Sequence, residues 1–198
     1  MSASARKSRV PASRSSAVQE EIGQSRPFAS VAQEATIALL RTASVVGRAL
    51  ERVVEPAGLS LAQYNALRII RGAGTGGIAT LAIRDRMIQE GTTITRILDK
   101  LEDAGLVRRE RSFPDRRQVI CVATDAGRRL LDRLDPLADA SDEAAMTALD
   151  ERELAQFVAL LDRVRAANAE RGAARTGAAA AAPGSATRAR PAPLARTR

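Results

Sequence analysis

The chain has 198 residues, 45% of them apolar, which is enough for one domain of ordinary size with a hydrophobic core. It contains no histidine and a single cysteine, Cys121, which excludes an internal disulfide, Ser-His-Asp and Cys-His catalytic sites and histidine-based zinc sites. With 31 basic against 23 acidic residues, the net charge of +8 points to an anionic partner.

The two ends of the chain carry the whole excess of positive charge. Residues 1–27 hold five Lys or Arg against two acids, and residues 169–198 hold six Arg against one acid. Neither segment has a pattern that would bury an apolar face, so we expect a disordered basic N-terminal arm over 1–27 and a disordered Ala-, Arg- and Pro-rich tail over 169–198. Residues 28–168 are expected to form the folded domain.

Uninterrupted apolar runs are short throughout the chain. The longest have five residues, as in 157–161, against the roughly 20 that a membrane span needs. We therefore expect a cytoplasmic protein with no membrane partner.

Apolar residues at helical spacing predict two helices before residue 72. The first spans about 28–55 and ends at Pro56-Ala57-Gly58, because proline lacks a backbone donor and glycine tolerates a left-handed turn. The second begins after Ser60 as its N-cap and runs to about Arg71. Its expected inward residues are Tyr64, Leu67 and Ile70.

The run Gly72-Ala73-Gly74-Thr75-Gly76-Gly77 matches the G-x-G-x-x-G pattern of dinucleotide-binding loops. That motif holds a pyrophosphate only when a parallel strand precedes it and a helix follows. Because the preceding segment here has helical spacing, we interpret the run as an inter-helix loop and expect no cofactor. A small nucleotide-binding enzyme is the alternative interpretation, which dinucleotide binding would test.

The stretch 81–123 is predicted to form a helix, a turn, a helix and a two-stranded ribbon. A short helix is expected over 78–87 and a turn over 88–91. In the next helix, about 92–104, the apolar stripe is Ile94, Ile97, Leu98 and Leu101, and the opposite face carries Thr92, Thr93, Thr95, Arg96 and Lys100. Such a helix can pack by its stripe while it offers hydroxyls and cations to the major groove of double-stranded DNA.

Two strands are expected at about 106–111 and 118–123, joined by a turn at Pro114-Asp115. Five arginines between residues 105 and 120, against two acids, make this ribbon basic, and a narrow minor groove attracts such an arginine. Beyond the ribbon, Thr124 is the expected cap of a helix whose apolar stripe is Leu130, Leu131, Leu134 and Leu137. Asp150–Glu153 is a capping-box pattern that opens a last helix, with Leu154, Phe157, Val158, Leu161 and Val164 on one side.

The single cysteine and the small number of aromatic residues limit which chemistry and which nucleic-acid partner the chain can have. Cys121 alternates with apolar neighbours in a predicted strand, which favours a buried, unreactive thiol over a redox sensor. The chain has only one Tyr and three Phe, too few for the base-stacking platforms of single-strand or RNA readers. Duplex DNA is therefore the expected partner.

Several motifs resemble, in this order and spacing, the MarR family of winged helix-turn-helix regulators. They are residues 59–67, 95–102, 105–109, 115–117 and 124–127, within a likeness that covers about 29–167. The resemblance implies a mainly α fold with a small β-hairpin wing. Its DNA-binding lobe would be about 57–123, and its dimerisation helices about 28–56 and 124–168.

The resemblance also implies a homodimer that binds a palindromic DNA site. By position, Thr92, Thr93, Thr95 and Arg96 would face bases or their flanking phosphates. Within the wing, Arg117 would enter the minor groove, Asp115 would orient it, and Arg116 would contact backbone phosphate. No metal site is expected.

We therefore expect a ligand-responsive transcriptional repressor and not an enzyme. Members of the family often sense phenolic or other small molecules, or oxidants, at a cleft between the dimer helices and the DNA lobe, so an aromatic effector is an expected partner. The chain departs from the family pattern in an extra turn at Ile88-Gln89-Glu90 and in a first helix without cysteine, which argues against thiol-based sensing. The alternative is an architectural protein that binds DNA without choosing its sequence.

Overall fold

The computed structural model describes residues 16–88, 93–111 and 118–180, with side chains described as far as 171. The elements in chain order are α1 (Ala17–Glu21), α2 (Val31–Val54), the 3-10 turn η1 (Glu55–Ala57), α3 (Leu61–Gly72), β1 (Ile78–Ala79), α4 (Thr80–Arg84), α5 (Ile94–Asp103), β2 (Val107–Arg111), β3 (Val119–Ala123), α6 (Asp125–Met146) and α7 (Glu151–Ala180). The predicted fold class, mainly helical with a small β part, is confirmed. The chain divides after Thr147 into one unit that ends with α6 and another that contains α7.

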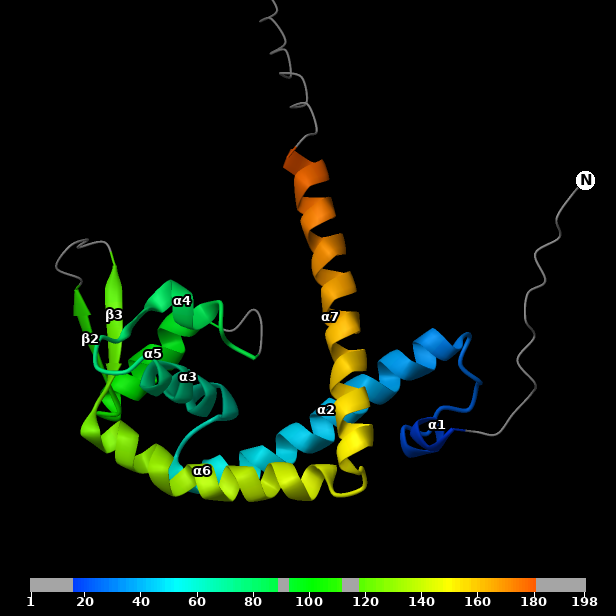
Figure 1. Ribbon diagram of the computed structural model, residues 1–198, viewed down its shortest axis with the longest axis horizontal. Helices are drawn as coiled ribbons and strands as arrows, with labels where there is room; N and C mark the ends of the chain where they lie inside the picture. The colour runs from blue at the N-terminus through cyan, green and yellow to red at the C-terminus, as the bar shows by residue number, and fades with distance from the viewer. Residues whose placement is uncertain (1–15, 89–92, 112–117, 181–198) are drawn as a thin grey trace, which may run out of the picture. The chain divides into compact units, whose positions relative to one another are not determined.

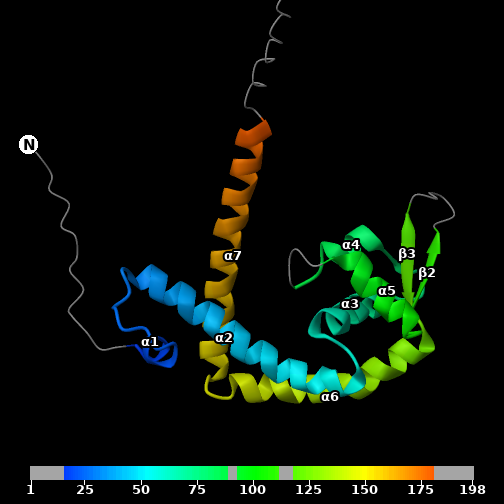
Figure 2. The ribbon, with the colours of Figure 1, turned by 180° about the vertical axis from the view of Figure 1, so that it is seen from behind.

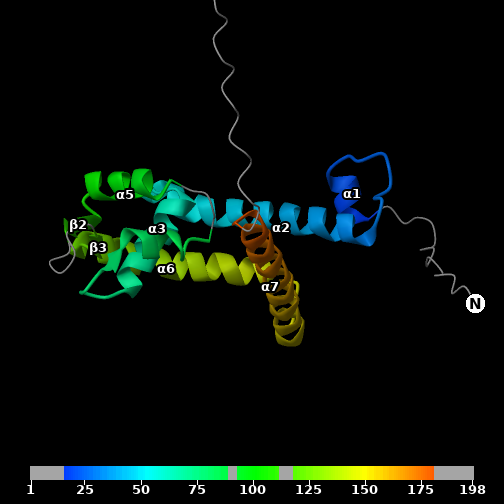
Figure 3. The ribbon, with the colours of Figure 1, turned by 90° about the horizontal axis from the view of Figure 1, so that it is seen from above.

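In the first unit, α2 and α6 pack side by side and run in opposite directions (Figures 1 and 3). Ser30 caps α2 by accepting the backbone N–H of Gln33 at 3.1 Å, and the chain leaves η1 through Gly58 at φ 76°. The lobe built from α3, α4, α5 and the sheet follows where α2 ends and precedes the start of α6. This order places one compact lobe at one end of a helix pair.

The buried core belongs to this unit and runs from Val54 to Ala138. Its large side chains that are almost completely buried are Tyr64, Leu67, Ile70, Ile83, Leu98, Leu101 and Leu131. Each buried aliphatic side chain of this size stabilises the fold by roughly 1.5–3 kcal/mol. Because these residues come from α3, α4, α5 and α6, the same contacts that form the core also hold α5 in place.

α3 begins as the sequence predicts. Ser60 Oγ accepts the N–H of Gln63 at 3.2 Å, and Gln63 Oε1 accepts the N–H of Ser60 at 2.8 Å, which completes a capping box. The inward residues Tyr64, Leu67 and Ile70 are buried, as expected.

The sheet has the antiparallel order β1-β3-β2. The predicted hairpin is confirmed: β2 and β3 pair from Val107 opposite Ala123 to Arg111 opposite Val119. β1 adds Ile78 opposite Cys121. At Gly77, with φ 68°, a β-carbon would lie 2.6 Å from the Cys121 carbonyl oxygen, so only glycine lets the chain enter β1 so close to β3.

The prediction of a short helix over 78–87 is wrong about both of its ends. Ile78 and Ala79 pair with β3 as a strand, and α4 is confined to Thr80–Arg84. The pairing partners of a two-residue strand lie some forty positions away, so helical spacing alone did not exclude it. The expected turn at 88–91 lies mostly outside the described residues.

Three further expectations need correction. The arm over 1–27 is not wholly without structure, because Ala17–Glu21 form α1, which packs on α2 through an ion pair of 2.6 Å between Glu21 and Arg41. The tail is helical from 169 to 180, since alanine has the highest helix propensity and continues α7. In α6, Leu137 is 57% exposed and Ala138 is buried in its place. The rest of both tails, 1–15 and 181–198, lies outside the described residues.

The helix starts after the hairpin follow the sequence. Thr124 Oγ1 accepts the N–H of Gly127 at 3.1 Å, which caps α6. Asp150 Oδ1 accepts the N–H of Glu153 at 2.8 Å, and Glu153 Oε2 accepts the N–H of Asp150 at 3.0 Å, which is the predicted capping box of α7. Within the described part of the chain, no helix is both long and apolar enough to cross a bilayer.

Candidate nucleic-acid interface

α5 presents the two faces that its sequence predicts. Ile94, Ile97, Leu98 and Leu101 are between 0% and 8% exposed and face the core. On the opposite side, Thr93, Thr95, Arg96 and Lys100 are all exposed. Thr92, the remaining residue assigned to this face, lies outside the described residues. α5 therefore offers hydroxyls and cations to solvent along one side.

Four basic side chains of the lobe are exposed and have no ionic partner among the described residues. Arg96 and Lys100 lie on the outward face of α5, Arg86 follows α4, and Arg111 ends β2. A cation without a carboxylate partner keeps its full charge for phosphate. Arg111 was not singled out from the sequence, because spacing along a strand does not reveal which of several arginines is already paired.

Other arginines of the lobe are neutralised by neighbours. Arg84 lies 2.9 Å from Asp85, and Arg108 lies 2.7 Å from Glu110. The ribbon, which its sequence makes strongly basic, therefore has less free positive charge in its described part than the count of arginines suggests.

Arg109 of β2 joins the hairpin to α5. Its Nη2 lies 2.7 Å from Asp99 Oδ1 and 2.6 Å from Glu102 Oε2, and its Nε donates to the same Glu102 oxygen at 2.7 Å. The backbone N–H of Arg109 donates to Glu102 Oε1 at 3.1 Å. The hydrogen bond from the guanidinium lowers the pKa of Glu102, so this carboxylate stays ionised at neutral pH. Glu102 was not singled out from the sequence, because its partner Arg109 lies on another element.

The wing residues Asp115, Arg116 and Arg117 lie outside the described residues. The strands that bracket them are described, and the described pair nearest to them is Arg111 opposite Val119. Figure 2 shows this hairpin beside α5 at the edge of the lobe. The DNA contacts expected of these three residues therefore remain predictions.

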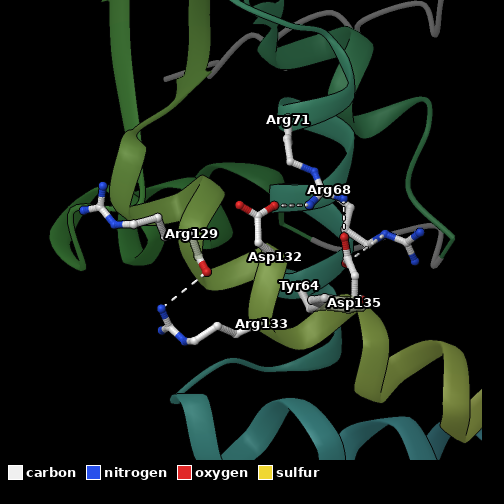
Figure 4. Close-up of polar contacts among 7 residues, drawn as sticks. All are labelled: Tyr64, Arg68, Arg71, Arg129, Asp132, Arg133 and Asp135. Carbon is white, nitrogen blue, oxygen red and sulfur yellow. Dashed lines mark hydrogen bonds and ion pairs between the residues drawn. The ribbon is translucent and has the colours of Figure 1, made fainter.

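A polar network fixes the lobe to α6 (Figure 4). Asp135 of α6 accepts the hydroxyl hydrogen of Tyr64 at 3.2 Å and a hydrogen bond from Arg71 Nη2 at 2.6 Å. The guanidinium of Arg68 lies 5.6 Å from the centre of the Tyr64 ring. Burial raises the pKa of Tyr64, so its hydroxyl stays a donor. No local sequence pattern predicts these contacts, because the two hydrogen bonds of Asp135 join residues that are 71 and 64 positions apart in the chain.

Two other candidate sites have a structural explanation. Cys121 is completely buried, as expected, and burial raises the pKa of its thiol, which leaves it unsuited to sensing oxidants. The G-x-G-x-x-G run follows the helix α3, and the described strands are all antiparallel. The parallel strand that a dinucleotide-binding loop needs is thus replaced by a helix.

A recognition-type helix packed against a three-stranded antiparallel sheet, with its polar face open, defines a winged helix-turn-helix DNA-binding protein. The MarR family model matches residues 59–119. The transcriptional regulator TtmR of Methylorubrum extorquens is 31% identical over 147 residues, which cover 74% of this chain and 71% of TtmR. The chain belongs to the MarR family of DNA-binding transcriptional regulators.

Solved structures show the same architecture. A MarR transcription factor from Planctomyces limnophilus is 37% identical, with a TM-score of 0.54 over 69% of this chain and 98% of that one. A cysteine-to-serine variant of MarR from E. coli, complexed with operator DNA, shares the fold at 23% identity, with a TM-score of 0.59 over 64% of this chain and 90% of that one. The first of these relatives is a transcription factor, and the second is bound to operator DNA.

Proposed function

We propose that the protein is a homodimeric, cytoplasmic repressor that binds a palindromic operator and leaves it when a small aromatic effector binds. The observation that carries the proposal is the outward face of α5, where Arg96 and Lys100 are exposed without an ionic partner among the described residues. A structural neighbour of this chain, the E. coli MarR variant, was crystallised with operator DNA.

The proposed contacts follow from the chemistry of the grooves. Arg96 can donate two hydrogen bonds to one guanine, and the methyl groups of Thr93 and Thr95 can contact thymine. Lys100 suits a backbone phosphate. Thr92 would extend this face, and in the wing Arg117 would enter the minor groove, with Asp115 orienting it and Arg116 on phosphate.

The proposed dimer is supported by apolar residues that the described fold leaves uncovered. No side chain of α7 described up to residue 171 belongs to the buried core, although Phe157, Leu160, Leu161 and Val164 form a stripe at helical spacing, with Leu160 55% and Val164 49% exposed. On α2, Leu40 is 62% exposed. A two-fold pair through these helices would place two recognition helices about 34 Å apart, one turn of DNA.

The proposed effector site is a groove of about 720 Å³ between the end of α2 and α6. Its lining includes Val53, Pro56, Leu130 and Leu134, with Arg52 and Arg133 among the lining residues. Both arginines hydrogen-bond to backbone carbonyls and have no carboxylate partner among the described residues. An aromatic carboxylate suits this mixture, and its binding would relieve repression if it favoured a spacing of the lobes that DNA does not accept.

The test is binding of the full chain to a duplex from its own promoter and to a random duplex of equal length, at one salt concentration. We expect a preference for the promoter, lost progressively as aromatic carboxylates are added. Arg96→Ala should weaken promoter binding by about 1–3 kcal/mol. The control is Arg163→Ala, which removes the same charge from α7.

Equal affinity of the wild-type protein for both duplexes would contradict the proposal and support an architectural protein. A preference that Arg96→Ala and Arg163→Ala leave equally intact would remove α5 from the interface. Aromatic acids that leave the complex unchanged would remove the effector from the proposal.

A further inference from the structure

Asp99 and Glu102 place two carboxylates on the helix that is proposed to face DNA. Both lie on α5, three positions apart and therefore on neighbouring parts of one face. A carboxylate near phosphates lowers affinity by Coulomb repulsion. Their presence beside Arg96 and Lys100 thus works against binding, unless they contribute something else.

Their partner is one side chain of the wing. Arg109 binds Asp99 and Glu102 at 2.7 and 2.6 Å and is only 26% exposed. Both oxygens of Glu102 are used by the same residue, one by its guanidinium and the other by its backbone N–H. A contact made by a planar guanidinium to two carboxylates, together with a backbone hydrogen bond, restrains orientation as well as distance.

The other ion pairs between described residues of the lobe do not join elements in this way. Arg84 pairs with the next residue, and Arg108 pairs with Glu110 on its own strand. Among the described residues of the lobe, Arg109 alone ties α5 to β2 by charge. β2 is the strand that leads into residues 112–117, where the wing contacts are proposed.

We infer that Arg109, held by Asp99 and Glu102, is a positioning residue for DNA recognition. It fixes the wing at one distance and angle from α5, so that the two reach adjacent grooves together. This inference rests on the proposed function, because it concerns how the same interface chooses its DNA site. It predicts that removing a negative charge from the DNA-facing helix weakens specific binding, which is the opposite of what Coulomb's law alone predicts.

The inference and Coulomb's law predict changes of opposite sign in DNA affinity, so variants that remove one negative charge distinguish them. Glu102→Gln and Asp99→Asn are compared with Asp103→Asn, which removes the same charge from an exposed residue of α5 without an ionic partner among the described residues. Affinity is measured for the promoter duplex and a random duplex at one salt concentration, and circular dichroism melting confirms that each variant is folded.

We expect Glu102→Gln to lose about tenfold in affinity for the promoter and nothing for the random duplex. Asp103→Asn should bind both duplexes equally well or more tightly. If Glu102→Gln and Asp103→Asn change binding in the same way, the inference is wrong.

A second measurement needs no DNA. Hydrogen exchange of the backbone amides of β2 should accelerate in Glu102→Gln and not in Asp103→Asn. Unchanged exchange in Glu102→Gln would overturn the positioning role even if DNA binding changed. A wild-type protein without any preference for its promoter would contradict the proposed function instead, and the exchange measurement would still decide whether Arg109 restrains the wing.

Discussion

Gly127 lies in the first turn of α6, against the backbone of Leu106. A β-carbon at this position would clash with the Leu106 carbonyl oxygen and lie 3.3 Å from Leu67 Cδ1. The same carbonyl oxygen accepts the N–H of Thr124 at 3.0 Å, and Thr124 Oγ1 donates to the Gly105 carbonyl at 2.7 Å. The start of α6 is therefore fixed to the start of the hairpin by backbone contacts that leave no room for a side chain.

Gly127→Ala should destabilise the protein by about 1–3 kcal/mol, because the added methyl group forces backbone apart in a packed region. Helix propensity predicts the opposite sign, since alanine is better than glycine by about 1 kcal/mol in a helix. Urea unfolding measures the difference. The control is Gly72→Ala at the end of α3, where nothing lies within 4 Å of the added atom and stability should hold or rise. Equal stability of the two variants would show that the contact at Gly127 relaxes easily.

Single residues also show where sequence reasoning stops. The outward position of Thr95, Arg96 and Lys100 follows from the period of the helix and needs no tertiary information. The period does not predict which arginines lack an ionic partner. Arg109 and Arg111 lie two positions apart on β2, and of these two only Arg109 contacts carboxylates of another element among the described residues. Pairing across elements depends on the fold, so the sequence predicts the chemistry of the interface better than its charge.

At the scale of elements, α3 links the DNA lobe to α6. Asp135 is 25% exposed at the side chain and receives hydrogen bonds from Tyr64 and Arg71, both on α3. Asp132, one turn earlier on α6, is 70% exposed and lies 3.5 Å from Arg71. Any change in the orientation of the lobe relative to α6 must stretch or break the contacts of Asp135.

Asp135→Asn should lower stability by about 1–3 kcal/mol, because it removes the charge that strengthens two partly buried hydrogen bonds. Asp132→Asn should change stability by less than about 1 kcal/mol, since its ion pair is largely solvated. Thermal or urea unfolding of the two variants gives the comparison. If both variants lowered the free energy of unfolding by the same small amount, the contacts of Asp135 would have no role in fixing the lobe.

Elements whose sequence signal is complete within a few neighbouring residues were predictable from the sequence. α3, α5 and the hairpin each contain such a signal, which is a cap, an apolar stripe or a strand pairing. β1 exists only because Gly77 allows Ile78 to approach Cys121, and α4 is shortened in consequence. At the end of α7 the error is that a helical segment, as far as Ala180, was predicted to be disordered. The composition there is typical of disorder, but it is also rich in alanine, the best helix former.

At the scale of the whole molecule, α7 raises the question of what covers its apolar stripe. None of the described side chains of its unit belongs to the buried core, and Leu160 and Val164 remain about half exposed at 55% and 49%. In the proposed dimer, a second copy would cover them. If each half-site of a palindrome binds one lobe of this proposed dimer, affinity would depend on this contact as well as on α5.

The double variant Leu160→Glu/Val164→Glu should therefore dissociate the proposed dimer, because burying two carboxylates without partners costs several kcal/mol. Light scattering after gel filtration would show a monomer, and affinity for the promoter duplex would fall. The matched control is Ala155→Glu/Ala166→Glu, which adds the same charges about half a turn away at exposed positions of α7. If the control dissociates as readily as the test variant, charge and not the stripe is responsible. If neither dissociates, or the wild-type protein is already a monomer, the α7 stripe does not form the dimer and the spacing argument for a palindromic operator loses its basis.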